Sequence, residues 1–372
     1  MKDFDNIYIL DSHCDTPSML IEGIDLSVRN THSHVDIPRL REGGVDAIFF
    51  SIYTPVTYFG NQATEYAINL ISKSYMAISD NCEDLALART ASDAYENKKN
   101  GKISVFLGME NGTPIQEDFS FLHLFNDFGI RYLTLCHNSD NQICDSAVGT
   151  HGTWGGLSPF GKRLLEELNS LGILADCSHA SDATFYDMLK YSKAPIIASH
   201  SSCRKLCNHP RNMTDQMIRD LSSEGGLVQI NFYPRFIDES FAVENQRYRR
   251  LSEFMEKWQA IYREDLYNDI AKDNYFSAIE ELKTIKTPGI SKVVDHIDRA
   301  VILAGYESVG LGSDFDGIDV APRGLEDISS YYKIASELKS RGYSTTHIEA
   351  IMGGNLLRVL DEAARLASFL RS

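Results

Sequence analysis

Three features that this 372-residue chain lacks limit its possible partners and location, before any motif is considered. No run of about twenty apolar residues is present, so no segment is expected to span a bilayer. Basic residues are too few for nucleic acid or an anionic membrane surface to be expected partners, because the formal net charge is −16. The first six residues lack the pattern of a signal peptide, which favours a cytoplasmic location.

A disulfide framework is also missing. The seven cysteines are an odd number scattered along a long chain, so we expect reduced, buried thiols. Cys203, Cys207 and His209 lie close enough in sequence to suggest a separate zinc site, but a fourth ligand is lacking.

Eight short apolar runs rich in Val, Ile, Phe and Leu are typical of strands covered on both faces. Segments of helical periodicity separate most of them, among them residues 63–79, 161–170, 182–191 and 215–223. This alternation predicts a (β/α)8 TIM barrel. An open doubly wound sheet would need a glycine-rich turn after the first strand, and none is there. The runs are residues 7–15, 45–54, 103–111, 132–137, 173–179, 195–200, 227–233 and 309–314.

One stretch departs from the repeat. Residues 241–286, between the seventh and eighth runs, are polar, aromatic and helix-like, and we interpret them as a helical insertion within a single catalytic barrel domain spanning residues 1–372. Insertions on barrel loops shape the site or an oligomer contact, although a merely ornamental hairpin is an equal alternative. A homodimer is therefore left open. Residues 348–370 have helical periodicity and are expected to cap or flank the barrel.

Residues with side chains that can bind metal ions lie at the ends of the apolar runs. His13 and Asp15 close the first run, Glu110 the third, His179 the fifth and His200 the sixth. Parallel barrel strands all end at one rim, so these side chains should gather in one cavity. Imidazole and carboxylate ligands suit zinc, and also manganese, iron or cobalt. Five ligands are too many for one open zinc but suffice for two ions, with Glu110 as the bridge.

The same residues carry a resemblance to the membrane (renal) dipeptidase family, peptidase family M19, within the amidohydrolase superfamily. Order and spacing match over nearly the whole chain except the insertion. The matching segments include Asp11-Ser-His-Cys-Asp-Thr-Pro17, Gly108-Met-Glu-Asn-Gly112, Tyr132-Leu-Thr-Leu-Cys-His137, Asp176-Cys-Ser-His179, Pro210-Arg-Asn212 and Gly312-Ser-Asp-Phe-Asp-Gly317.

The resemblance implies one zinc on His13 and Asp15, a second zinc on His179 and His200, and a bridging Glu110. It also implies further roles for three residues, each with a chemical rationale. His137 would contact the substrate carbonyl and the tetrahedral intermediate. Arg211 would hold the terminal carboxylate. Asp314 would handle protons and face the substrate amine.

Several of these polar residues could instead have ordinary structural roles. Arg211 could be a solvated surface charge and His137 a buried, hydrogen-bonded histidine. Asp176 and Asp316 are interpreted as groups that orient ligands or support loops. The pair His32 and His34 resembles a metal pair but lies in a loop, so we interpret it as structural or solvent-facing.

The predicted function is hydrolysis of dipeptides by a hydroxide that bridges two zinc ions, with tolerance for a D-residue at the C-terminal position as the resemblance suggests. The catalytic set is Glu110, His137 and Asp314, and the substrate-binding set is His137, Arg211 and Asp314. Two alternatives remain. One is another amidohydrolase-type reaction on an N-acyl amino acid, a lactone or a base. The other is a non-catalytic metal-binding barrel.

Overall fold

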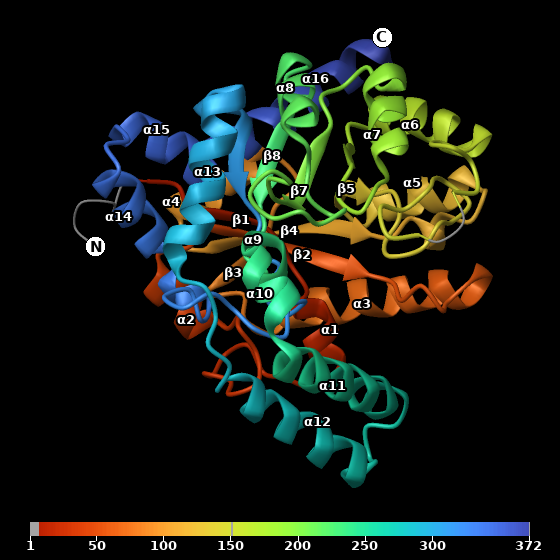
Figure 1. The fold of residues 1–372 in the computed structure, drawn as a ribbon. Helices are drawn as coiled ribbons and strands as arrows, with labels where there is room; N and C mark the ends of the chain where they lie inside the picture. The colour runs from red at the N-terminus through yellow and green to blue at the C-terminus, as the bar shows by residue number, and fades with distance from the viewer. Residues whose placement is uncertain (1–6, 150–151, 372) are drawn as a thin grey trace.

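A parallel barrel forms the centre of the protein (Figure 1). The computed structural model describes residues 7–149 and 152–371. Residues 1–6, which entered the prediction of location, lie outside this part. The strands are β1 (Leu10–Cys14), β2 (Ala47–Tyr53), β3 (Leu85–Leu87), β4 (Ile103–Glu110), β5 (Ile130–Thr134), β6 (Leu174–Asp176), β7 (Ile197–Ser201), β8 (Leu227–Ile230) and β9 (Val309–Leu311).

Eight of these strands pair in the order β1-β2-β4-β5-β6-β7-β8-β9, all in parallel. Backbone hydrogen bonds close the ring where β1 ends and β9 has just ended. The Asp314 N–H donates to the His13 carbonyl at 3.0 Å, and the Asp15 N–H donates to the Phe315 carbonyl at 2.8 Å. The predicted (β/α)8 class is confirmed, and each of the eight apolar runs overlaps one of these strands. The short β3, which pairs only with β4, was not predicted.

Helices surround the barrel and connect its strands (Figure 1). Predicted helices at residues 182–191 and 215–223 have those bounds in the structure. Their starts are capped by the side chains of Ser181 and Thr214, which accept from the backbone N–H groups of Thr184 and Met217. The helices that precede the insertion are α1 (Thr16–Ile21), α2 (Ile37–Gly43), α3 (Gly60–Asp80), α4 (Ala91–Lys99), α5 (Phe119–Asp127), α6 (Pro159–Leu171), α7 (Asp182–Tyr191), α8 (Asp215–Ser223) and α9 (Pro234–Ile237).

The remaining helices are α10 (Glu239–Glu244), α11 (Gln246–Glu264), α12 (Asp269–Leu282), α13 (Ile290–Ala304), α14 (Tyr332–Ser340), α15 (Thr345–Glu349) and α16 (Asn355–Leu370). Leu356, Leu357 and Leu360 of α16 join a cluster with side chains of the barrel strands, including Leu10, Phe106 and Leu227. The C-terminal helix therefore flanks the barrel, as predicted. Within the described residues, no helix has both the length and the apolar character that crossing a membrane requires.

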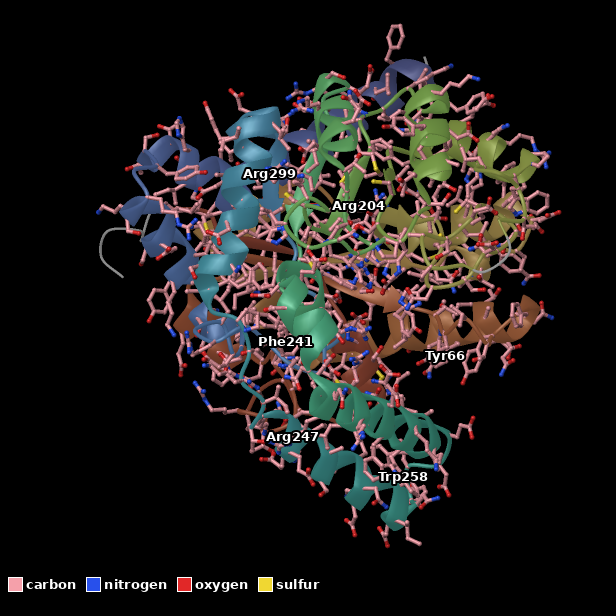
Figure 2. All side chains as sticks on the ribbon, viewed as in Figure 1. Tyr66, Arg204, Phe241, Arg247, Trp258 and Arg299 are labelled. Carbon is pink, nitrogen blue, oxygen red and sulfur yellow. The ribbon has the colours of Figure 1, made fainter. Side chains whose placement is uncertain are left out.

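Between β8 and β9 the chain forms α9 to α13, and α11 and α12 project from the barrel as a hairpin (Figure 1). Trp258 and Arg247 lie on this hairpin, and Phe241 lies where it approaches the barrel (Figure 2). A hydrophobic cluster of its own holds the hairpin together. Its members are Phe241, Tyr248, Met255, Tyr262, Ala271, Tyr275, Ala278, Leu282, Ile285 and Val320. We call α11 and α12 the insertion hairpin below.

Candidate metal centre

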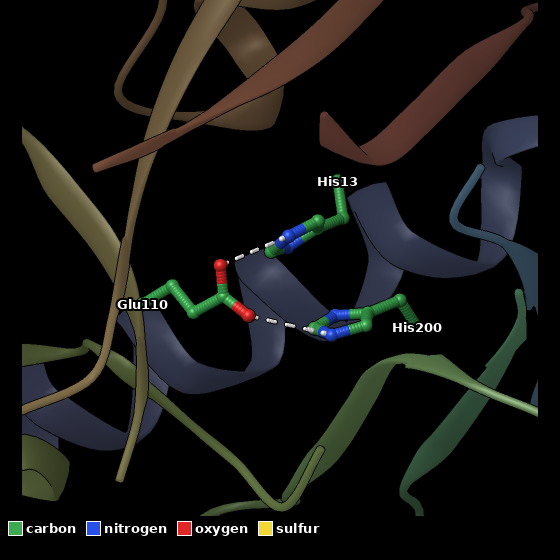
Figure 3. Close-up of side chains that lie close together, drawn as sticks. All are labelled: His13, Glu110 and His200. Carbon is green, nitrogen blue, oxygen red and sulfur yellow. Dashed lines mark ion pairs between the residues drawn. The ribbon is translucent and has the colours of Figure 1, made fainter. Parts of the chain in front are cut away.

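The five predicted metal ligands meet at the carboxyl end of the barrel. His13 is the fourth residue of β1, Glu110 the last residue of β4 and His200 a residue of β7. Asp15 directly follows β1, and His179 lies three residues after the end of β6. All five side chains are buried. Figure 3 shows the Glu110 carboxylate reaching between the imidazoles of His13 and His200. Residues nearly two hundred positions apart thus share one small space, as the strand-end argument predicted.

Glu110 divides its two oxygens between two groups of ligands. Its Oε2 lies 3.5 Å from His13 Nε2, and that nitrogen lies 3.6 Å from an Asp15 oxygen. Its Oε1 lies 3.0 Å from His179 Nε2 and 3.5 Å from His200 Nε2. This is the geometry required of a carboxylate that gives one oxygen to each of two cations.

The protonation chemistry of the cluster fits a cation. The Nε2 atoms of His179 and His200 face each other at 3.0 Å, and their Nδ1 atoms are engaged with Asn138 Oδ1 and Ser199 Oγ. Burial and nearby cationic side chains lower the pKa of both imidazoles well below the usual value, so two neutral rings present lone pairs to one point. A metal ion at that point would stabilise this close approach of the two Nε2 atoms.

Unpartnered atoms around Glu110 support the same interpretation. His13 Nε2 and Asp15 Oδ1 are buried and have no hydrogen-bond partner among the described residues. Burial would lower the pKa of His13, but Glu110 and Asp15 outweigh it and raise this pKa well above its usual value. In the part of the chain that the structure describes, three groups of side chains have donor atoms close enough to hold an ion, and all three belong to this cluster: His13, Glu110 and His200; Glu110, His137 and His179; His13, Asp15 and Asp314.

Each histidine ligand is oriented through its Nδ1 atom. Tyr132 Oη lies 2.7 Å from His13 Nδ1, and Asn138 Oδ1 lies 2.9 Å from His179 Nδ1. An amide oxygen only accepts, so Nδ1 of His179 carries the proton and Nε2 is free for a metal. Sequence reasoning missed Tyr132 and Asn138 as orienting groups. Their only sequence signal is that they lie within or next to a matching segment.

His200 is oriented through a two-step relay. Its Nδ1 lies 2.8 Å from Ser199 Oγ, which donates to Asp176 Oδ2 at 2.6 Å. Thr134 Oγ1 also donates to this oxygen, and the backbone N–H groups of Ser178 and Ser199 donate to Asp176 Oδ1. Asp176 therefore supports a ligand rather than binding a metal itself, which agrees with its interpretation from sequence. The role of Ser199 was not predicted.

Two of the site residues have left-handed backbone conformations that L-amino acids rarely adopt. His179 has φ 69° and Asp314 has φ 65°, and Asn111, next to Glu110, has φ 75°. Such conformations cost about 1–3 kcal/mol each and persist only where the surroundings impose them. The loops after β4, β6 and β9 therefore hold their side chains in fixed directions.

The three residues predicted to act on substrate surround the same cluster. His137 Nε2 lies 3.9 Å from Glu110 Oε1, and burial lowers the pKa of His137 to about 4, so the ring is neutral. Asp314 Oδ2 accepts from Asn231 Nδ2 at 2.9 Å. Burial, together with Asp15 and Glu110, raises the pKa of Asp314 to about 7. A neutral imidazole and an acid that titrates near neutrality suit proton transfer.

Arg211 is a buried cation rather than a solvated surface charge. Arg211 is only 5 % exposed, and its Nε has no hydrogen-bond partner among the described residues. One of its terminal nitrogens lies 3.4 Å from the His200 carbonyl oxygen. The guanidinium also lies 5.6 Å from the centre of the Phe236 ring. A buried guanidinium with an unused donor is a ready site for a carboxylate.

A cavity of about 1220 Å³ joins these groups. Asp15, Glu110, His137, His179, Arg211 and Asp314 line its inner end, and side chains of the insertion hairpin line another wall. The cavity is far larger than a metal cluster requires, so it leaves space for a small molecule beyond these side chains.

Other polar pairs noted in the sequence have structural roles. The thiols of Cys203 and Cys207 donate to the carbonyls of His296 and Arg235, and among the described residues they share no cluster of metal-binding atoms. His34 Nδ1 accepts from the Asp316 N–H at 2.9 Å, and the His32 ring stacks on Phe276 with centroids 4.3 Å apart. These histidines and Asp316 fasten loops at the cavity rim.

Comparison with known proteins agrees with this geometry. The membrane dipeptidase family, peptidase family M19, matches residues 4–372. Dipeptidase verJ of Clonostachys rogersoniana is 31 % identical, over 97 % of this chain and 86 % of its own. Dipeptidase aclJ of Aspergillus oryzae is 30 % identical, over 91 % of this chain and 72 % of its own. The probable dipeptidase PvdM from Pseudomonas aeruginosa has the same fold, with a TM-score of 0.83 at 23 % identity, covering 98 % of each chain.

Proposed function

Because the chain belongs to the membrane dipeptidase family, peptidase family M19, a family of metal-dependent dipeptidases, we propose that it hydrolyses dipeptides with two zinc ions. His13 and Asp15 would hold one ion, His179 and His200 the other, and Glu110 both. When bound, such a pair activates water as the nucleophile and polarises the carbonyl under attack. The observation that carries the proposal is the division of the two Glu110 oxygens between the two histidine groups.

The remaining residues define where a dipeptide would lie. Arg211 would pair its planar fork with the free carboxylate, because it is buried beside the cluster with an unused donor. His137 would donate to the oxygen of the carbonyl as negative charge develops there. Asp314 would take a proton from the attacking water and return it to the leaving nitrogen.

We also propose tolerance for a D-residue at the C-terminal position. A metallopeptidase from Rhodobacter sphaeroides has been solved with a phosphinate mimic of the dipeptide L-Ala-D-Ala. It resembles this chain with a TM-score of 0.79 at 23 % identity, over 96 % of this chain and 99 % of its own. Rates of hydrolysis for matched L,L and L,D dipeptides test this tolerance.

The test is a panel of L,L and L,D dipeptides, with N-acetyl amino acids, a lactone and a nucleobase as competitors. We expect two zinc ions per chain by elemental analysis, hydrolysis of both dipeptide classes, and loss of turnover on chelation that added zinc reverses. Arg211→Met should lower the affinity for dipeptides with a free carboxylate far more than the affinity for the corresponding dipeptide amides. Turnover that survives complete metal removal would exclude the proposed mechanism, and preferred hydrolysis of a competitor would reassign the substrate.

A further inference from the structure

The insertion hairpin forms part of the cavity that contains the metal centre. Met255, Glu256, Gln259 and Arg263 of α11 and Tyr275 and Ile279 of α12 line it. Arg263 is the cationic member of this group. It comes from the last turn of α11 and reaches back toward the barrel, so one arginine of the insertion shares a cavity with Arg211 of the barrel rim.

Arg263 is held in place by an acid of the barrel. Its Nε donates to Glu22 Oε1 at 2.6 Å, and Glu22 is the residue that ends α1. The Glu22 side chain is 2 % exposed and that of Arg263 is 23 % exposed. Among the described residues, Arg263 hydrogen-bonds through Nε alone, and the second carboxylate oxygen of Glu22, Oε2, is buried without a partner. The ion pair therefore fixes the guanidinium through Nε and leaves its terminal donors for the cavity.

The two arginines are anchored to different parts of the barrel. Arg211 contacts the His200 carbonyl at β7, whereas Arg263 is fastened to α1, which begins directly after Asp15 and the end of β1. β1 and β7 are three strands apart on the shorter way around the eight-stranded ring, one strand short of directly opposite, so the two arginines approach the centre from well-separated strands. Glu110 directs one oxygen to His13 of β1 and the other to His200 of β7 (Figure 3), so its carboxylate marks the centre that these two strands share.

This arrangement orients a dipeptide. With its carboxylate on Arg211 and its scissile carbonyl at Glu110, the N-terminal residue must extend toward β1 and α1. Asp314 lies on that side, close to His13 and Asp15, and suits the free amine. The side chain of the N-terminal residue then faces the wall that carries Arg263.

We propose that Arg263 is a specificity-determining residue that favours dipeptides whose N-terminal residue has a carboxylate side chain, namely aspartyl and glutamyl dipeptides. This inference rests on the proposed dipeptidase function. A guanidinium with two unused terminal donors, oriented by Glu22, is pre-organised for a carboxylate. Because Glu22 offsets part of the charge, the expected preference is moderate rather than absolute.

The test compares kcat/KM for Glu-Ala, its neutral isostere Gln-Ala, and Ala-Ala. We expect the zinc-loaded wild type to prefer Glu-Ala to Gln-Ala, and Arg263→Gln to lower kcat/KM for Glu-Ala by about tenfold while the other two change less than about twofold. Arg247→Gln is the matched control, because Arg247 is exposed on the same helix and donates to Thr284.

A second variant keeps the inference testable if Arg263→Gln fails to fold. Glu22→Gln retains Arg263 and removes the competing charge, so the ratio of Glu-Ala to Gln-Ala hydrolysis should rise. Equal losses for all three dipeptides in Arg263→Gln, or an unchanged ratio in Glu22→Gln, would show that the ion pair only fastens the hairpin. If the zinc-loaded wild type hydrolyses none of the dipeptides, the proposed function fails, and the inference with it.

Discussion

The barrel rim and the insertion hairpin border one cavity but are held by different interactions. At the rim, ligand side chains come from the ends of short, fully buried strands, and further buried groups orient them, as Tyr132 does for His13. The hairpin has its own hydrophobic cluster and is joined to the barrel at separate polar contacts, such as Arg263 with Glu22 and Tyr248 with Asp319. The rim therefore holds its polar side chains through buried contacts, whereas the hairpin meets the barrel through contacts that lie outside the metal cluster.

The largest effect should follow from Glu110→Gln at the rim. An amide offers one oxygen where the carboxylate offers two, and its NH₂ group repels a cation, so the bridge is lost. We expect at most one tightly bound zinc per chain and a fall in kcat/KM of at least about 10³-fold. Elemental analysis and steady-state kinetics measure both, with the exposed Glu117→Gln as control. Two retained ions and wild-type turnover would contradict the role of Glu110.

A pH effect should arise where the barrel meets the segment that leads into the hairpin. His296 of α13 is fully buried, its Nδ1 accepts from the Cys203 N–H at 2.9 Å, and its Nε2 donates to the Ile237 carbonyl at 3.1 Å. Burial lowers the pKa of His296 to about 4. The unfolded chain binds this proton near pH 6.5. Its contribution to stability is therefore complete above about pH 6.5 and is lost as the pH falls toward 4.

The loss amounts to about 3 kcal/mol, because each pKa unit is worth about 1.4 kcal/mol. Urea unfolding between pH 7.5 and 4.5 measures the free energy of unfolding for the wild type and for His296→Gln, which cannot titrate. The difference between the two curves should shrink as the pH falls. Parallel curves would show that this histidine is protonated equally in the folded and unfolded states.

Some parts of the molecule could be predicted from the sequence and others could not. Strand ends were predictable because continuous apolar runs ended in residues such as His13 and Glu110, and parallel strands bring their ends together. The three residues of β3 were too short a pattern to notice. Of the helices, α7 and α8 start at capping side chains, Ser181 and Thr214, whereas α1 is a single short segment that begins at Thr16 without a side-chain cap.

Contacts between polar side chains could not be predicted. Nothing in the sequence pairs Arg263 with Glu22, 241 positions away, because polar contacts follow no period. The left-handed conformations of His179 and Asp314 are imposed by the folded loops rather than by residue type. The resemblance implied the ligand set, but not the orienting contacts of Tyr132, Asn138 and Ser199.

Ser199→Ala tests a group at the rim that orients a predicted metal ligand and does not itself bind the metal. Without Ser199 Oγ, the Nδ1 proton of His200 loses its link to Asp176, and the imidazole becomes a weaker, less directed ligand. We expect the affinity for one of the two zinc ions to fall about 10–100-fold. Competition with a chelator measures it. Ser199→Thr should restore most of the affinity, and Ser201→Ala, whose hydroxyl contacts Ser178 instead, should leave it unchanged.

Tyr248→Phe gives the smallest expected effect and tests whether the hairpin is energetically separate. The Tyr248 hydroxyl donates to the Asp319 carboxylate at 2.9 Å and lies 2.5 Å from the Tyr233 hydroxyl. Removing it should cost about 1–2 kcal/mol, because Asp319 is left with fewer donors. Hydrogen exchange should accelerate in α11, while kcat/KM for Ala-Ala stays within about threefold of the wild type.

Tyr267→Phe is the control for this variant, because Tyr267 is 94 % exposed at the tip of the hairpin. Faster exchange confined to α11 and α12 would mean that the hairpin opens while the metal centre keeps its geometry. Faster exchange in β1 and β4 as well, with activity falling in parallel, would mean that the hairpin and the rim form one cooperative unit. In that case Arg263 could not tune substrate choice without also altering the chemistry at Glu110.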